Sequence, residues 1–296
     1  MLPQVSLVIP CYNAAETIER TILSLINQNY ASLQLILIDG ASTDETMTIV
    51  EKYRSYFYMV ISESDQGQAN ALNKGFTHAT GEWRGWLCAD DELLPNSIQH
   101  LVAILLENPE INLITGGCQR IFADGTIVET TPRVDVMERI SYHNGIEQPS
   151  TIWKSELHYK AGEINETYNY AFDWYWWNQL KCAGANIKVD DRIISRYYFS
   201  DTNKTSTGSR KLVEEMYRVI KKFGPLRGFL ADIYLFLYLN FDLYGCYDKP
   251  VRVSNLRSFI WSVSLVILIL CCSKDLIFAY NWNFASKQER GICWYR

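Results

Sequence analysis

The sequence lacks the cysteine and histidine clusters that bind zinc or cross-link a small secreted fold. No Cys-x-x-Cys pair occurs, and the four histidines are scattered along 296 residues. The eight cysteines lie far apart, except for Cys271 and Cys272. Cys11 and Cys88 lie within apolar runs that are typical of small buried side chains. These absences exclude a disulfide-stapled domain and a zinc finger, and they predict a reducing, cytoplasmic compartment.

The sequence also lacks an uncharged run of the length that crosses a bilayer. Residues 258–273 form a run of sixteen between Arg257 and Lys274, whereas a spanning helix needs about 20 residues. The N-terminus leads directly into an apolar run at residues 5–10, so no signal peptide is expected. We predict a cytoplasmic protein that is peripheral on the inner face of the membrane. A soluble cytoplasmic protein is the alternative.

Positive charge is scarce in the first two thirds of the chain and in excess afterwards. Residues 1–203 carry 14 Lys and Arg against 26 Asp and Glu, and residues 204–296 carry 14 against 7. We predict an acidic catalytic domain followed by a helical, basic and aromatic tail that contacts an anionic membrane surface through 224–285. Two apolar tail segments, 226–239 and 258–273, are expected to lie as helices at that surface, or alternatively to pack as a hairpin on the domain. No nucleic-acid partner is expected.

Apolar runs alternate with amphipathic segments in the first part of the chain. The runs that favour strands are residues 5–10, 34–38, 58–61 and 86–89. Helical patterns follow them, and the pairs Asn13 with Glu16 and Ser42 with Glu45 match the residues that start helices. This alternation predicts an α/β fold, Rossmann-like, with a mostly parallel sheet and helices on both faces.

Polar residues close three of these strands. In a parallel sheet with right-handed crossovers, the carboxyl ends of the strands share one edge. Asn13, Asp39, Asp90 and Asp91 are therefore expected to converge there. Ligands of open α/β sheets bind at this edge, so the sequence predicts a binding rim.

Three consecutive carboxylates, Asp90, Asp91 and Glu92, follow the apolar run at 86–89. Like charges at the end of a buried strand resist desolvation unless a counter-charge is present. Hard oxygen ligands suit Mg²⁺ or Mn²⁺, which proteins share with substrate phosphates. The alternative is that this acidic segment only caps the helix that begins near Pro95.

The pattern becomes less regular beyond residue 110. A strand is expected at 111–115, a hairpin at 120–128, and a strand-like region at 187–199 in which Asp190 and Asp191 form a turn or an exposed bend. These elements predict a second half of the domain that is built differently from the first.

A helix over residues 170–180 is crowded with aromatic side chains and carries one acid, Asp173. Such an acid caps a helix more often than it catalyses a reaction. The aromatic residues around it either belong to the core or stack on a sugar. The sequence pattern alone leaves both alternatives open.

Five motifs in this order resemble the inverting glycosyltransferases of family 2, of bacterial polysaccharide type, which have the GT-A fold. The motifs are Val-Ser-Leu-Val-Ile-Pro-Cys-Tyr-Asn (5–13), Leu-Ile-Asp-Gly-Ala-Ser-Thr-Asp (37–44), Asp-Gln-Gly with Asn-Lys-Gly (65–75), Ala-Thr-Gly-Glu-Trp with Ala-Asp-Asp (79–91) and Ala-Phe-Asp-Trp (171–174). The resemblance covers residues 4–200. It implies a GT-A domain with a nucleotide-binding half, 1–115, and an acceptor half, 116–203, ahead of a C-terminal helical appendage.

The resemblance implies a role for each matching residue on the donor side. The nucleotide-binding residues are Pro10, Tyr12, Asn13, Asp39, Ser42, Asp44, Asp65, Lys74 and Asp90. Among them, Asp39 accepts a hydrogen bond from the pyrimidine ring, and Asp65 and Lys74 lie near the ribose and diphosphate. Asp90 and Asp91 hold Mn²⁺ or Mg²⁺, although Cys88 stands where many relatives place an acid or an amide. Either aspartate is a candidate for the direct ligand, and Asp91 is favoured as the one closer to solvent.

On the acceptor side the resemblance implies that Asp173 is the catalytic base. Gln148, Pro149 and Ser150 match an acceptor-side loop, and Trp174 belongs to the same side. In the implied reaction a hexosyl or N-acetylhexosaminyl group leaves a nucleoside diphosphate, with UDP expected, for a hydroxyl of a glycan or lipid-linked acceptor. The metal neutralises the leaving diphosphate, and one base and one displacement invert the anomeric centre.

Two other classes of protein compete with this interpretation. A sugar nucleotidyltransferase shares the layered plan, but it needs a Gly- and Arg/Lys-rich phosphate loop after the first strand, and Cys-Tyr-Asn-Ala-Ala supplies none. A non-catalytic nucleotide-sugar-binding module is the other alternative, if Cys88 marks a decayed site.

Overall fold

The computed structural model describes residues 2–141, 143–199, 204, 209–224, 232 and 263. The chain divides into two compact units, one formed by 1–137 with 145–200 and the other by 138–144 with 201–296. The predicted tail segments at 226–239 and 258–273 lie outside the described residues. Within the part of the chain that is described, no helix is long and apolar enough to cross a membrane.

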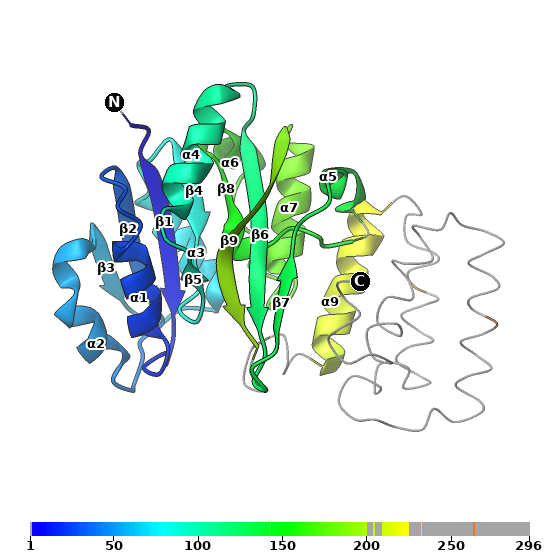
Figure 1. Ribbon diagram of the computed structural model, residues 1–296. Helices are drawn as coiled ribbons and strands as arrows, with labels where there is room; N and C mark the ends of the chain where they lie inside the picture. The colour runs from blue at the N-terminus through cyan, green and yellow to red at the C-terminus, as the bar shows by residue number, and fades with distance from the viewer. Residues whose placement is uncertain are drawn as a thin grey trace. The chain divides into compact units, whose positions relative to one another are not determined.

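The first unit is built on one nine-stranded sheet, in the order β3-β2-β1-β4-β8-β6-β9-β5, with β7 paired to β6 (Figure 1). Its strands are β1 Val5–Cys11, β2 Leu33–Asp39, β3 Met59–Ser62, β4 Trp83–Trp86, β5 Glu92–Leu93, β6 Leu113–Ile121, β7 Ile127–Thr130, β8 Thr151–Lys154 and β9 Ile187–Tyr198. The helices with described bounds are α1 Ile18–Ile26, α2 Thr46–Lys52, α3 Gln68–Thr77, α4 Ser97–Glu107, α5 Val136–Arg139, α6 Ser155–Ala161, α7 Phe172–Cys182 and α9 Ser209–Phe223, with 3₁₀ turns η1 Arg54–Tyr56 and η2 Gln148–Ser150.

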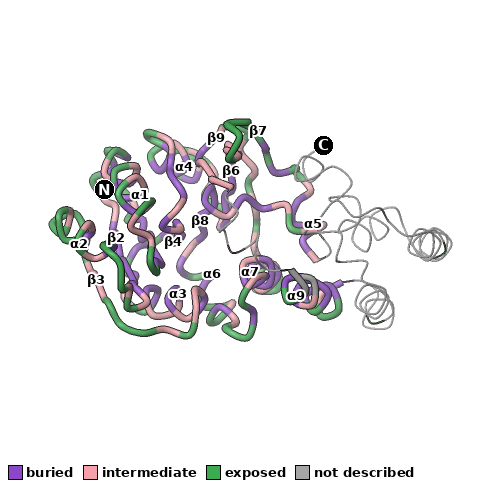
Figure 2. Tube along the Cα trace, turned by 90° about the horizontal axis from the view of Figure 1, so that it is seen from below, coloured by how far each residue is buried: buried purple, intermediate pink, exposed green. Residues whose placement is uncertain are grey.

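Four neighbouring strands, β3, β2, β1 and β4, are parallel, and the pairing is mixed beyond them. Every residue of β1 and of β4 is buried, because helices cover both faces of the sheet. Figure 2 shows α1 and α4 on one side of the strands and α3, α6 and α7 on the other. The expected α/β fold with helices on both faces is therefore confirmed.

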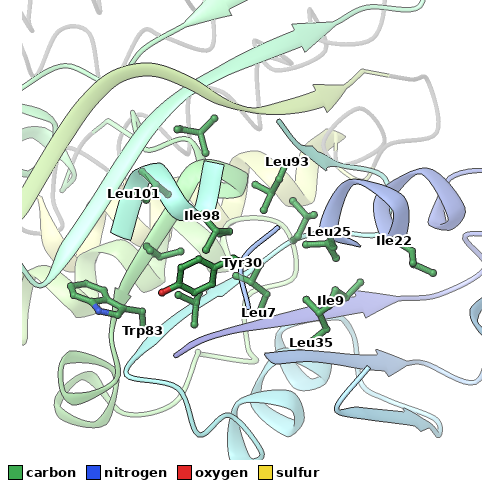
Figure 3. Packing of buried hydrophobic residues seen from close by; sticks show 14 of the residues in the cluster. Leu7, Ile9, Ile22, Leu25, Tyr30, Leu35, Trp83, Leu93, Ile98 and Leu101 are labelled. Carbon is green, nitrogen blue, oxygen red and sulfur yellow. The ribbon is translucent and has the colours of Figure 1, made fainter. Parts of the chain in front are cut away.

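The face under α1 and α4 is packed with aliphatic side chains (Figure 3). Leu7 and Ile9 of β1 belong to this cluster, together with Ile22 of α1 and Ile98 and Leu101 of α4. All five side chains are 3 % exposed or less. Burying side chains of this size stabilises a fold by about 1.5–3 kcal/mol each, so this face holds the rim residues on a rigid base.

The opposite face carries a cluster of aromatic rings that fastens α7 to the end of β4. Trp86, the last residue of β4, stacks on Trp177 with ring centroids 5.3 Å apart, and it lies 6.2 Å from Phe172 at the start of α7. Trp153 of β8 packs edge-on against both tryptophans. Trp174, at 3 % exposed, is buried as well. The aromatic residues around Asp173 therefore belong to the core, and an acceptor-side role for Trp174 stays a prediction.

Two helices begin later than their apparent start signals. Helix α1 begins at Ile18 and α2 at Thr46, and neither has a side-chain cap. Asn13 and Ser42 instead bind each other's loops, as described below. The capping pattern was misleading because these polar side chains find partners about 30 residues away in the chain.

Two strand boundaries also differ from the predictions. Strand β4 ends at Trp86, three residues before the end of the predicted strand, so Asp90 lies in a turn. Asp190 and Asp191 lie inside the continuous strand β9, whose pairing with β6 shifts register between Thr115 and Gly117. An irregular register accommodates the polar pair without a turn. The hairpin predicted at 120–128 is confirmed by β6 and β7.

Candidate functional site

The carboxyl ends of the parallel strands lie in register at one edge of the sheet. Cys11, Asp39 and Ser62, the last residues of β1, β2 and β3, are direct neighbours across the strands. Trp86 at the end of β4 pairs with Val8, three residues before Cys11. The loops that follow these strands therefore share one rim, as the sequence predicted for residues 13, 39 and 90–91.

Asp39 lies at the centre of this rim and is 0 % exposed. Its carboxylate accepts hydrogen bonds from the Ser42 backbone N–H at 3.0 Å, from the Ser42 hydroxyl, from the Ser62 hydroxyl at 2.6 Å and from the Cys11 thiol at 3.7 Å. An ionised carboxylate has about four lone-pair sites, so these donors occupy its capacity. This geometry favours a role in shaping the loop after β2, and direct contact with a pyrimidine stays a prediction.

The loops after β1 and β2 are tied together by side-chain to backbone bonds. The Asn13 N–H donates to Ser42 Oγ at 2.7 Å, and Asn13 Oδ1 accepts from the Thr43 N–H at 2.9 Å. Asp44 accepts from the Ala15 N–H at 3.1 Å. The hydroxyl of Thr46, followed by backbone donors, lowers the pKa of Asp44. These bonds hold the two loops as one surface.

Pro10 is buried within β1, whereas Tyr12 is 62 % exposed beside the same loop. Asn13 has a φ of 47°, a left-handed conformation that asparagine tolerates better than most residues. The chain therefore turns sharply after β1. This turn leaves the Tyr12 ring accessible at the rim, and a role of the buried Pro10 in nucleotide binding stays a prediction.

Asp65 approaches the backbone of the neighbouring loop. A Cβ added at Gly40 would lie 2.8 Å from Asp65 Oδ2, so only glycine fits there without a shift. Asp65 Oδ1 accepts from the Gly67 N–H at 2.7 Å. Lys74 pairs with Glu63 at 2.7 Å and donates to the Ser64 carbonyl at 3.0 Å. Asp65 thus reaches the rim, whereas Lys74 is bound to the segment after β3.

The acidic run divides into three different environments. Glu92 in β5 binds Arg20 at 2.8 Å and Arg196 at 3.3 Å, and accepts from the Tyr198 hydroxyl at 2.9 Å. Two guanidinium groups already supply its counter-charge, so Glu92 is not a metal ligand candidate. No local sequence pattern predicts this network, because the partners of Glu92 lie more than 70 residues away in the chain.

Asp91 is 1 % exposed, and Asp90 is partly exposed. The expectation that Asp91 is closer to solvent is therefore wrong, because the strand ends at Trp86 and the following turn directs residue 91 inward. Neither Asp91 oxygen has a hydrogen-bond partner of ordinary geometry among the described residues. Burial, and then the charge of Asp90, raise the pKa of Asp91 well above its usual value.

Ligand atoms of Cys88, Asp90 and Asp91 lie within 4.8 Å of one another. A bare, buried carboxylate in such a cluster costs free energy unless a proton or a cation accompanies it. Two carboxylates at the strand-end rim are also the oxygen ligands that Mg²⁺ and Mn²⁺ prefer. The residues present therefore fit a divalent cation, and the alternative that this run caps α4 is wrong, since Asn96 precedes that helix.

The predicted acceptor-side loop is the turn η2 beside this cluster. Gln148 donates from Nε2 to the Trp86 carbonyl at 2.9 Å, and its Oε1 accepts from the Cys88 thiol at 3.4 Å. Pro149 and Ser150 are buried, and Ser150 binds Ser195 and the Gly117 carbonyl inside the sheet. Gln148 is therefore the only one of these three residues with a side chain at the rim.

Asp173 is partly exposed and lies in the first turn of α7, where Ala171 occupies the N-cap position. Its Oδ1 accepts from the Trp174 N–H at 2.6 Å. The neighbouring Phe172 packs on Trp86, two residues before Cys88. The aromatic cluster thus brings the helix start that carries Asp173 to the strand end that carries the acidic turn.

A parallel α/β half with an acidic carboxyl-end rim, joined to a mixed half that presents a further carboxylate, defines a glycosyltransferase of the GT-A class. The family model of Glycosyl transferase family 2 matches residues 6–174, more than half of the chain. The chain belongs to that family. Its resemblance to family 2 and its enzyme class are thereby confirmed.

Similar proteins support the same class. An uncharacterized glycosyltransferase of Rickettsia typhi is 27 % identical over 263 residues, covering 80 % of this chain and 81 % of the relative. A poly-β-1,6-N-acetyl-D-glucosamine synthase of Staphylococcus epidermidis is 30 % identical over 114 residues, 38 % of this chain and 28 % of the synthase.

Two solved structures share the fold. S. aureus TarS 1-349 in complex with UDP-GlcNAc has a TM-score of 0.57 and 17 % identity, covering 97 % of this chain and 92 % of TarS. The mannosyltransferase PcManGT from Pyrobaculum calidifontis, in complex with GDP-Man and Mn²⁺, has a TM-score of 0.58 and 15 % identity, with coverage of 99 % and 88 %.

Proposed function

We propose that this glycosyltransferase moves a hexosyl or N-acetylhexosaminyl group from a UDP-sugar to a hydroxyl of a glycan or lipid-linked acceptor, with inversion. The observation that carries the proposal is the buried carboxylate of Asp91, whose oxygens have no hydrogen-bond partner of ordinary geometry among the described residues, beside Asp90 at the strand-end rim. That arrangement costs stability, and binding of a cation on a diphosphate offsets the cost.

On the donor side, the exposed Tyr12 ring and the tied loops after β1 and β2 form the surface for the nucleotide. An aromatic ring offers a face for a base, and backbone groups of the loop that Asp39 shapes lie next to it. Asp65 reaches the same rim beside Gly40. UDP is favoured as the nucleotide because TarS, which has the same fold, is described with UDP-GlcNAc.

Asp90 and Asp91 would hold the cation, Mn²⁺ or Mg²⁺, which when bound neutralises the charge on the leaving diphosphate. Asp173 accepts the proton from the acceptor hydroxyl as that oxygen attacks the anomeric carbon. A single displacement with one base inverts the configuration, by the same geometry as in inverting glycosidases. The dipole at the start of α7 favours the negative charge that a base needs.

The decisive measurement is transfer from UDP-sugars in Mn²⁺, in Mg²⁺ and in EDTA. We expect transfer with either cation and none in EDTA. Equal activity in EDTA and Mn²⁺ contradicts the metal site. Release of pyrophosphate from UTP and a sugar phosphate would instead identify a nucleotidyltransferase, and donor binding without turnover would identify a binding module.

We also propose that the tail attaches the enzyme to a membrane surface. The basic excess of residues 204–296 and the uncharged run at 258–273 support this. Full-length protein should co-sediment with anionic vesicles, less so at high salt, and the double variant Arg257→Gln, Lys274→Gln should bind more weakly. Equal binding to neutral and anionic vesicles contradicts the electrostatic part of the proposal.

A further inference from the structure

Cys88 lies one residue before the acidic turn, and its sulfur belongs to the same cluster as the carboxylates. The Cys88 Sγ and oxygens of Asp90 and Asp91 lie within 4.8 Å of one another. Asp91, more than nine-tenths buried, has two oxygens without a hydrogen-bond partner of ordinary geometry among the described residues. A cation bound here would give these two oxygens the partner that they lack.

Two glutamine side chains hold the Cys88 sulfur at this position. Gln68 Nε2 donates to Cys88 Sγ at 3.0 Å, and Gln68 is the first residue of helix α3. The Cys88 thiol donates to Gln148 Oε1 at 3.4 Å, and Gln148 is itself anchored on the Trp86 carbonyl. A thiolate, once formed, is a metal ligand.

We propose that Cys88 is a direct ligand, so that the cation site is a mixed thiolate–carboxylate site that selects softer divalent cations, of the Zn²⁺ and Cd²⁺ type, over Mg²⁺. The proposal rests on the proposed function only in placing a cation at this rim. Thiolates bind soft and borderline cations, whereas Mg²⁺ requires hard oxygen ligands. The carboxylates of Asp90 and Asp91 provide the remaining protein ligands.

The test is Cd²⁺ and Mg²⁺ binding to the full-length, reduced protein without nucleotide. The probe is the ultraviolet charge-transfer band of a thiolate bound to Cd²⁺, with affinities from calorimetry. We expect the band in the wild type and in Cys182→Ser, which removes an exposed cysteine far along the chain. We expect it to be reduced by one thiolate equivalent in Cys88→Ser, with the Cd²⁺/Mg²⁺ affinity ratio lowered at least about tenfold.

A second variant keeps the test informative if serine perturbs the fold. Cys88→Asp restores the hard ligand type and should bind Mg²⁺ more tightly than the wild type, without the Cys88 band. An unchanged band and an unchanged affinity ratio in Cys88→Ser would overturn the proposal. Absence of sugar transfer in every variant, together with a Cys88-dependent band, would reject the proposed function and leave the metal inference standing.

Discussion

Arg84 in β4 and Asp91 in the segment that follows β4 are both buried ionisable side chains, but they differ in their hydrogen bonding. Arg84, 2 % exposed, donates to the Ser155 hydroxyl, the Ala79 carbonyl and the Tyr159 hydroxyl at 2.6–2.9 Å. Asp91, 1 % exposed and seven residues later, has no hydrogen-bond partner of ordinary geometry among the described residues. Similar burial therefore accompanies three hydrogen bonds in one case and none of ordinary geometry in the other.

The difference separates a structural charge from a functional one. No carboxylate pairs with Arg84 in the described part of the chain, yet neutral acceptors and the Tyr159 ring at 4.5 Å hold it in place. Burial lowers the pKa of Arg84, but an arginine stays charged in proteins. We propose that Asp91, by contrast, is completed by the cation of the donor site. A buried charge with its partners built in supports the fold, and one without them marks a binding site.

The largest effect on sugar transfer is expected from a substitution of Asp173, which lies near the rim like Asp91. Asp173→Asn keeps the shape and first-turn position of the side chain but removes the proton acceptor. Transfer should fall about 10²- to 10⁴-fold, with UDP-sugar affinity unchanged, because the base faces the acceptor. Rates and calorimetry on one variant test both. Asp191→Asn, at an exposed site in β9, is the control. Transfer by Asp173→Asn within a few fold of the wild-type rate would show that another residue is the base.

For the structural charge, Arg84→Leu should lower the free energy of unfolding by about 3 kcal/mol, because three polar groups lose their buried partner. UDP affinity of the folded protein should not change. Urea unfolding and calorimetry measure the two quantities. Arg54→Leu removes an exposed arginine that donates to the Phe57 carbonyl, and should cost much less. A loss of UDP affinity in Arg84→Leu would contradict the distinction between a structural Arg84 and a functional Asp91.

Asp39 is intermediate between Arg84 and Asp91, because it lies at the rim like Asp91 but accepts hydrogen bonds from four donors. Asp39→Ala should weaken UDP binding by about 1–3 kcal/mol, the scale of a lost charged hydrogen bond, and should also destabilise the fold. Ser62→Ala removes one donor and keeps the carboxylate, so it should retain UDP affinity. Unchanged UDP affinity in Asp39→Ala, measured by calorimetry, would reduce Asp39 to a support for its loop.

The smallest effect is a pH dependence of stability in EDTA. The pKa of Asp91 is raised in the folded protein, so above about pH 4 the unfolded chain loses a proton that the folded one keeps. This carboxyl should therefore make stability fall as pH rises toward its folded pKa, and Asp91→Asn should remove that fall. Asp124, whose pKa the Thr126 backbone N–H lowers, contributes with the opposite sign and is the control. Identical pH profiles of unfolding for wild type and Asp91→Asn would contradict the buried, unpartnered state.

The sequence by itself determined the class of fold, the family and the location of the rim. Apolar runs of strand length, alternating with helical periodicity, are properties of neighbouring residues, and a parallel sheet brings strand ends together whatever its loops do. The hairpin at 120–128 was predictable for the same reason. The motifs at 5–13 and 79–91 are contiguous and were recognised without any knowledge of the contacts they make.

Only the tertiary structure decided which polar residues at the rim are already satisfied. Asn13 and Ser42 match helix starts in sequence but bind across two loops, and Glu92 is neutralised by Arg20 and by Arg196 from the far end of the domain. Asp91 lies inward and Asp90 outward because β4 ends earlier than its apolar run. The physical reason is that hydrogen-bond partners and desolvation depend on which groups meet after folding, and local sequence patterns do not contain that information.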